Sequence, residues 1–148
     1  MLLDDILTMW KDDSVIEDNN LDGTTVKCAV LHSKYLELYS VAKLQLKRKE
    51  ADLASMKKDK WLYYTGKMTR EEMDERGWAY DPFNGGAKPL KSDLEMYYVS
   101  DPDIKKLCGQ IDYQKTIVEA LDEILATIRW RHQAIRNIID YKKFTAGY

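Results

Sequence analysis

Apolar residues recur at steps of three and four over most of this chain, which is the pattern of amphipathic α-helices. The first such stretch covers residues 2–11 and is followed by a polar loop at residues 12–23. Neither proline nor glycine occurs at residues 24–64, so this region is predicted to form one long helix, or two helices with a break near residue 50. Gly66 then supplies a residue that readily ends a helix.

Helix-breaking residues are concentrated in the middle of the chain. A short helix is predicted at residues 70–76, because Thr69 can cap it and Glu72 can complete a capping box. Residues 77–92 contain two prolines and three glycines, and they are predicted to be irregular. We therefore assign residues 77–99 to a loop or linker.

The last long helix has clear signals at its start and along one face. Asp101 and Pro102 suit its first turn, and no proline follows, so the helix is predicted to run from about residue 100 to Phe144. Apolar residues follow a heptad pattern along it, with a further row of isoleucines beside the seam. A face this wide can pack within the chain on one side and between chains on the other. The residues predicted to mediate oligomerisation are Ile117, Leu121, Ile124, Leu125, Ile128, Ile135 and Ile139.

Together these elements predict an all-α protein with a helical hairpin and a long C-terminal, coiled-coil-like oligomerisation helix. We expect one domain over residues 1–148, with N-terminal helices at 1–70, the loop at 77–99 and the C-terminal helix at 100–148. Charged residues make up 32% of the chain. This share exceeds the ordinary value of about a quarter and suits an extended helical protein better than a compact α/β enzyme.

Neither a membrane span nor a secretion signal is predicted. No apolar run reaches the length of about 18 residues that a transmembrane helix needs. The N-terminus lacks the basic and apolar regions of a signal peptide. Cys28 and Cys108 lie inside helical patterns, so we interpret them as free thiols of a reduced, cytoplasmic protein.

Charged side chains are segregated along the chain, although the net charge is only −2. Residues 1–25 carry seven acidic side chains and one lysine, whereas residues 43–70 carry nine basic side chains and three acidic ones. Residues 71–103 return to nine acidic and three basic side chains. The basic block can hold a polyanion while the acidic surfaces repel it.

Motifs that would indicate an enzyme are missing from the sequence. It contains no P-loop, no GxGxxG, no GxSxG and no HExxH. His32 and His132 have no second histidine or cysteine at the spacing of metal ligands. We therefore expect no catalytic activity, no bound metal and no cofactor.

A basic and aromatic segment at residues 57–67 is the strongest functional signal. Its lysines can track phosphates and its aromatic side chains can stack on exposed bases. The predicted DNA-binding residues lie in the block 43–70 and are Lys47, Arg48, Lys57, Lys58, Lys60, Tyr63, Tyr64 and Lys67. The same pattern also fits an aromatic core beneath a solvated face of lysines. Lys47 and Arg48 could extend this basic track, but ordinary ion pairs with Glu50 and Asp52 are the favoured interpretation.

Three stretches of the chain resemble the UvsY-like phage recombination mediators. They are Leu31-His32-Ser33-Lys34-Tyr35-Leu36, Lys58-Asp59-Lys60-Trp61-Leu62-Tyr63-Tyr64-Thr65-Gly66, and Ala134-Ile135-Arg136-Asn137-Ile138-Ile139-Asp140 followed by Phe144, Ala146 and Gly147. The resemblance covers residues 28–66 and, with fewer matches, residues 100–147. No motif carries over at residues 68–99.

This resemblance implies a function and a set of partners. Proteins of this family form a homo-oligomeric ring of about six or seven subunits and bind single-stranded DNA. They contact a RecA-like recombinase and a single-stranded-DNA-binding protein, and they help the recombinase load where the binding protein already sits. The resemblance places the protein in the cytoplasm of a phage-infected bacterium. It also matches Lys58 and Lys60 to the family's DNA-contacting basic pair, and the C-terminal helix to its oligomerisation element.

A second interpretation is a structural helical adaptor. Such a protein would self-associate through its C-terminal helix and use the basic block to bind an acidic protein partner. Under both interpretations, Leu121→Asp or Ile128→Asp is expected to give monomers.

Overall fold

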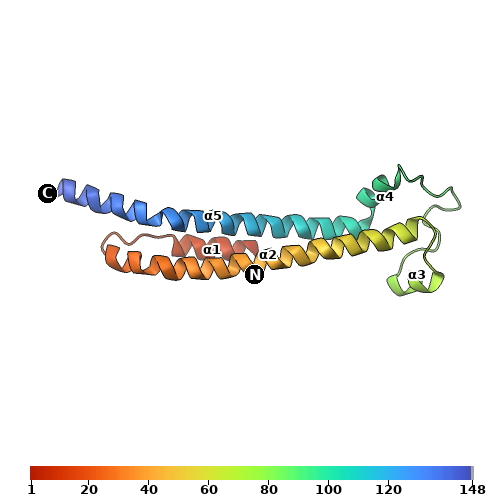
Figure 1. Ribbon diagram of the computed structural model, residues 1–148, viewed down its shortest axis with the longest axis horizontal. Coiled ribbons are helices and arrows are strands. Elements are labelled where there is room, and N and C mark those ends of the chain that lie inside the picture. The colour runs from red at the N-terminus through yellow and green to blue at the C-terminus, as the bar shows by residue number, and fades with distance from the viewer. Residues whose placement is uncertain (148) are drawn as a thin grey trace. The chain divides into compact units, whose positions relative to one another are not determined.

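The structure is a computed structural model of this chain, and it describes residues 1–147. Those residues form helices and no strand, which confirms the predicted all-α class (Figure 1). In chain order the helices are α1 (Leu3–Asp13), α2 (Leu21–Tyr64), α3 (Arg70–Arg76), α4 (Leu94–Ser100) and α5 (Pro102–Thr145). The two long helices therefore have nearly the bounds that the sequence predicts.

Helix α2 is continuous for 44 residues, so the break considered near residue 50 does not occur. It ends where Gly66 adopts a φ of 73°, a conformation that glycine takes without a steric penalty. The N–H of Lys67 then donates to the carbonyl of Leu62 at 2.9 Å, as in a Schellman motif.

The short helix α3 has the predicted capping box. The N–H of Glu72 donates to the Thr69 hydroxyl at 3.2 Å, and the N–H of Thr69 donates to the Glu72 carboxylate at 3.1 Å. Gly77, with a φ of 70°, ends the helix in the left-handed region. Local capping signals thus determine this element, which confirms the prediction.

Helix α4 corrects the assignment of residues 77–99 to a loop or linker. Residues 77–92 contain no α-helix, but Leu94–Ser100 is helical. Seven residues are too few to show a clear apolar period, and a helix this short depends on tertiary packing. Leu94 provides that packing, because it is buried in an apolar cluster with aromatic side chains.

The described chain divides into two compact units, where the sequence suggested one domain. The first unit contains Met1–Gln45 and the chain from Gln114 onward, and the second contains Leu46–Tyr113. Helices α2 and α5 each contribute to both units. The candidate DNA-binding segment, residues 43–70, lies in the second unit from Leu46 onward.

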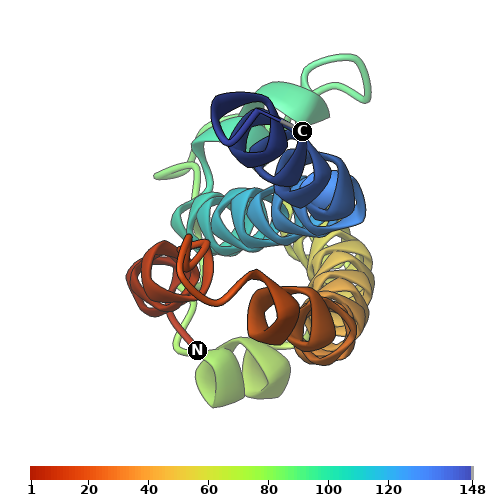
Figure 2. The same ribbon diagram turned by 90° about the vertical axis from the view of Figure 1, so that its left-hand side faces the viewer.

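The first unit is a packing of α1, the N-terminal part of α2 and the C-terminal part of α5 (Figure 2). Its fully buried core consists of Ile6, Tyr35, Ala42, Ile117, Leu121, Ile124, Leu125 and Ile128. Tyr35 of α2 packs edge-on against Trp10 of α1, with the ring centroids 5.4 Å apart. The buried amide of Gln114 is hydrogen-bonded, since it donates to the carbonyl of Ala42 at 2.9 Å.

This core corrects the role predicted for the α5 seam. Six of the seven residues assigned to oligomerisation are buried within the single chain, five of them in the core shared with α1 and α2, and Ile139 is 37% exposed. The heptad pattern therefore records packing inside the protein. Surfaces that face outward on α5 lie elsewhere on the helix.

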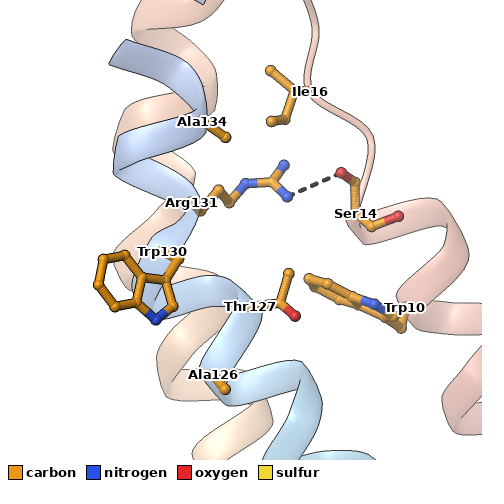
Figure 3. A pocket seen from close by; sticks show the side chains of 8 residues that line it. All are labelled: Trp10, Ser14, Ile16, Ala126, Thr127, Trp130, Arg131 and Ala134. Carbon is orange, nitrogen blue, oxygen red and sulfur yellow. Dashed lines mark hydrogen bonds between the residues drawn. The ribbon is translucent and has the colours of Figure 1, made fainter. Parts of the chain in front are cut away.

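Arg131 of α5 is buried. Its guanidinium donates to the carbonyl of Ser14 at 3.0 Å (Figure 3) and to the carbonyl of Val15 at 2.8 Å. These carbonyls follow the end of α1, so Arg131 fastens the α1–α2 connection to α5. Trp10 and Trp130 line the groove on either side of this contact.

In the described part of the chain, no helix combines the length and apolar character that crossing a membrane requires.

Candidate nucleic-acid interface

The second unit is built on aromatic packing around the last turns of α2. Its buried cluster contains Tyr63, Tyr64, Met68, Met73 and Leu94, with Leu62, Trp78, Phe83, Tyr97 and Tyr98 packed against it. The rings of Tyr63 and Trp78 lie 5.1 Å apart, and those of Tyr64 and Tyr97 lie 5.6 Å apart. These contacts fix the rotation of α2 about its axis in this region.

That rotation divides the predicted DNA-binding residues between two sides of the helix. Lys60, Tyr63 and Tyr64 point inward and are 3%, 7% and 8% exposed. Lys47 and Lys58 are exposed on the outer side. The tyrosines therefore belong to the core of this unit. This agrees with the alternative that the segment forms an aromatic core beneath a solvated face of lysines.

Lys60 is paired with two carboxylates of α5. Its ammonium lies 3.0 Å from Asp101 and 2.9 Å from Asp103. The same nitrogen is 3.8 Å from the centre of the Trp78 ring, which makes a close cation–π contact. A phosphate cannot reach this ammonium in the described conformation, because protein atoms surround it.

Asp101 joins this ion pair to the start of α5. One carboxylate oxygen accepts from the N–H groups of Asp103 and Ile104, at 3.0 and 3.1 Å, and so caps the helix. The other oxygen accepts from the Tyr64 hydroxyl at 2.5 Å. Burial favours the neutral acid, but hydrogen bonds from Tyr64, Ile104 and Lys60 outweigh it and lower the pKa of the Asp101 carboxyl.

The outer side of α2 presents a different surface. Lys47, Ala51, Ala54, Lys58 and Trp61 follow one another at steps of four, three, four and three, and all five are exposed. This stripe, which we call the outer α2 face, extends about 21 Å at the rise of ~1.5 Å per residue. The alanines between its cations leave the backbone accessible to an extended ligand.

An aromatic and a cation lie together at the C-terminal end of the outer α2 face. Trp61 is 36% exposed, and the Lys67 ammonium lies 4.2 Å from the centre of its ring. This arrangement offers a surface for stacking next to a positive charge.

Several basic side chains along this part of α2 are not neutralised by an acidic partner. Among the residues that the structure describes, Lys47, Arg48, Lys57 and Lys58 form no ion pair, so the pairs considered with Glu50 and Asp52 are absent. Asp59 is the one acidic side chain inside the lysine run. The Arg76 guanidinium of α3 neutralises it at 2.7 Å.

Comparison with known proteins identifies the family of this chain. A family model described as "Recombination, repair and ssDNA binding protein UvsY" matches residues 9–148. The chain belongs to the UvsY family. This confirms the resemblance that the three sequence stretches indicated.

The UvsY protein of phage T4 supports this family assignment over nearly the whole length of the chain. The chain is 26% identical over 147 residues to "Recombination protein uvsY" of Enterobacteria phage T4, and the match covers 99% of each protein. It is also similar to a crystal structure of the bacteriophage T4 recombination mediator protein UvsY, with a TM-score of 0.82, 25% identity and coverage of 99% of this chain and 98% of the other. A second crystal form gives a TM-score of 0.80 at 23% identity, covering 98% and 99%, and supports the fold.

The ion pairs of Lys60 with Asp101 and Asp103 were not predicted from the sequence of this UvsY-family chain. The sequence indicated only that Asp101 suits the first turn of α5, and nothing in the spacing of Asp101 and Asp103 points to a lysine about 40 residues earlier. A helical wheel of α2 does contain a signal. Lys60, Tyr63 and Tyr64 share the face that carries the apolar stripe, whereas Lys58 and Trp61 lie on the opposite face.

Proposed function

We propose that this UvsY-family protein binds single-stranded DNA through the outer α2 face, extended by Lys67. The observation that carries the proposal is the placement of Lys47, Lys58 and Trp61 on one exposed side of a single helix. Cations there neutralise phosphates, and the exposed indole stacks on a base. Lysine suits this task because its flexible, point-like charge follows an irregular backbone. Neither feature reads a base sequence, so binding is expected to be sequence-independent.

The biological role that we infer is recombination mediation in the cytoplasm of the host bacterium. The protein would help a RecA-like recombinase load onto single-stranded DNA that is covered by a single-stranded-DNA-binding protein. A single outer α2 face carries few cations and would bind weakly. A homo-oligomer repeats the face, and linked sites raise avidity by about 10²–10⁴-fold. Assembly is therefore part of the proposed function.

Lys47→Ala and Lys58→Ala are each expected to weaken binding to single-stranded DNA and to lower its salt dependence. Each lost phosphate contact reduces the slope of log affinity against log salt by about 0.7 for a single strand. Fluorescence anisotropy of a labelled single strand, measured over a series of salt concentrations, gives both quantities. Trp61→Ala is expected to lower affinity with little change in slope, because stacking releases few ions.

Lys115→Ala is the matched control, since Lys115 is an exposed lysine on α5 outside the outer α2 face. It should leave both affinity and slope unchanged. Unchanged binding in Lys47→Ala and Lys58→Ala would refute the site. An intact oligomer without DNA affinity at low salt would favour the alternative function, an adaptor for an acidic protein partner.

We propose that assembly uses the outward side of α5 and that a second copy of this chain covers it. Trp130, Tyr141 and Phe144 are 70%, 68% and 79% exposed. They lie on one side of the helix with Ala134 and Asn137 between them, at steps of four and three. Three large aromatic side chains in one heptad row are costly to leave in water. Repetition of this contact around a closed ring of about six or seven subunits would cover every copy.

Trp130→Ala combined with Tyr141→Ala is expected to give smaller assemblies without loss of folding, because both side chains are exposed in the isolated chain. Size-exclusion chromatography with light scattering measures the mass, and circular dichroism reports the helix content. Tyr80→Ala, at a half-exposed tyrosine of the second unit, is the control and should keep the assembly intact. An unchanged mass in the Trp130/Tyr141 variant would show that the interface lies elsewhere.

A further inference from the structure

We propose that Lys60 is a positioning residue for DNA binding and makes no contact with phosphate itself. Its ion pairs with Asp101 and Asp103 hold the last turns of α2 in the rotation that turns Lys58 and Trp61 outward. The inference rests on the proposed DNA-binding function of the outer α2 face. It assigns different roles to Lys58 and Lys60, which lie only two positions apart and look equivalent in the sequence.

The environment of Lys60 leaves its ammonium almost inaccessible to DNA, because the side chain is 4% exposed. An ammonium has three N–H donors, and two of them are directed to carboxylates at 3.0 and 2.9 Å. The Trp78 ring covers the ammonium at 3.8 Å. Its charge is also outweighed locally, since two carboxylates face one lysine. Lys60 therefore adds little positive potential at the outer side of the helix.

The contacts around Lys60 connect three segments of the second unit. The Trp78 indole N–H donates to the same Asp103 oxygen that Lys60 contacts, at 3.0 Å, which adds the segment after α3. Asp101 caps α5 and accepts from Tyr64 of α2. Without Lys60, two buried or half-buried carboxylates would face each other with no cation between them. Hydration of these uncompensated carboxylates requires α2 and the start of α5 to move apart, so that water can enter between them.

Such a movement acts directly on the outer α2 face. Lys58 and Trp61 flank Lys60 in the same helical turn, so a rotation of this turn redirects both side chains. Trp61 also carries the contact with Lys67, which lies just beyond the end of α2. The cluster around Lys60 thus controls the direction of the groups that we propose to meet DNA.

The two possible roles of Lys60 make opposite predictions for its partners. If Lys60 bound phosphate, Asp101→Asn with Asp103→Asn would release its charge, strengthen binding and steepen the salt slope. If Lys60 positions the helix, the same double substitution should weaken binding as Lys60→Met does. Asparagine keeps an oxygen that can cap α5, so the substitution removes charge while it preserves the cap.

The experiment measures single-stranded-DNA affinity against salt for Lys60→Met, for Asp101→Asn with Asp103→Asn, and for Lys58→Ala. It also records the indole N–H signal of Trp61 in ¹⁵N-labelled full-length protein. We expect Lys60→Met and the double aspartate variant to bind about tenfold more weakly, to lose up to the slope of the Lys58 contact, about 0.7, and to shift the Trp61 signal. Lys58→Ala should lower the slope by about 0.7 and leave the Trp61 signal in place. Lys60→Arg, which can keep both ion pairs, should restore affinity.

Two controls separate positioning from general instability. Ile111→Val removes a methyl group from a buried position of the same unit without touching the Lys60 cluster, and it should leave affinity unchanged. If Lys60→Met does not fold, Asp103→Asn alone provides a milder test, because the Asp103 side chain is 46% exposed. Stronger binding by the aspartate variants, or a Trp61 signal that Lys60→Met leaves in place, would overturn the proposal. If Lys58→Ala changes nothing, the outer α2 face fails as the DNA site, while the Trp61 signal still reports whether Lys60 positions it.

Discussion

Leu121→Asp is expected to unfold the unit formed by α1 and the adjoining parts of α2 and α5, and not to release a folded monomer. Leu121 is 0% exposed at the centre of that core. Truncation of a core leucine to alanine alone costs about 2–5 kcal/mol. A buried aspartate without a partner adds a desolvation penalty of several kcal/mol, so the total is comparable to the whole stability of about 5–15 kcal/mol. Loss of helical circular dichroism at 25 °C and of the thermal transition would show it.

Trp130→Asp provides the matched comparison on the same helix. Trp130 is 70% exposed, so an aspartate there meets water and should leave the helix content nearly unchanged. Ile139→Asp, at a position that is 37% exposed, should have an intermediate effect. A folded, monomeric Leu121→Asp protein would contradict the packing described for this unit and would return the α5 seam to the role of a subunit interface.

The heptad pattern of α5 predicts which side of the helix is buried, but not what covers that side. It identified the side of the helix that leaves water, and Leu121, Leu125 and Ile128 are indeed buried. The identity of the covering surface is not encoded in the period, because a helix of the same chain and a helix of a second copy bury the same side chains. Only the tertiary structure shows that α1 and α2 cover this side.

Long elements and local caps were predictable for a similar reason. The apolar period over α2 and α5 accumulates over many turns, and the capping box of Thr69 and Glu72 is a contact between residues three apart. Helix α4 has neither a long apolar period nor a local capping box. It is short and is stabilised by the packing of Leu94 against side chains that are distant in sequence.

The candidate site was predictable as a region but not residue by residue. Composition identified the basic and aromatic segment, most of which lies in the last turns of α2. Composition alone treats Lys58 and Lys60 alike, whereas side chains two positions apart on a helix point about 200° apart. The distinction between them depends on Asp101 and Asp103, which reach Lys60 only when the start of α5 packs beside α2.

Asp101→Ala is expected to cause the largest loss of stability in the second unit. Alanine removes the cap of α5, which costs about 0.5–2 kcal/mol. It also takes away one partner of a buried ion pair, a change that costs about 3–5 kcal/mol when a charge stays buried. Asp103 remains beside Lys60 at 2.9 Å and reduces this second cost. Urea unfolding, followed through the fluorescence of the tryptophans and by circular dichroism, should show a clear fall in the midpoint.

Comparison with Asp101→Asn divides this loss into its two causes. Asparagine preserves the cap and removes the charge, so its stability should lie between those of the native protein and Asp101→Ala. The native carboxyl has a lowered pKa, because hydrogen bonds to its charged form outweigh the effect of burial. Its stabilising effect is therefore present above the unfolded pKa of about 3.9 and is lost as the pH falls through the lower folded value. The difference between native protein and Asp101→Asn should accordingly persist at pH 6 to 8 and shrink below about pH 4. A difference that is independent of pH over this range would show that Asp101 acts through its shape and its cap, and that its charge contributes nothing to holding Lys60.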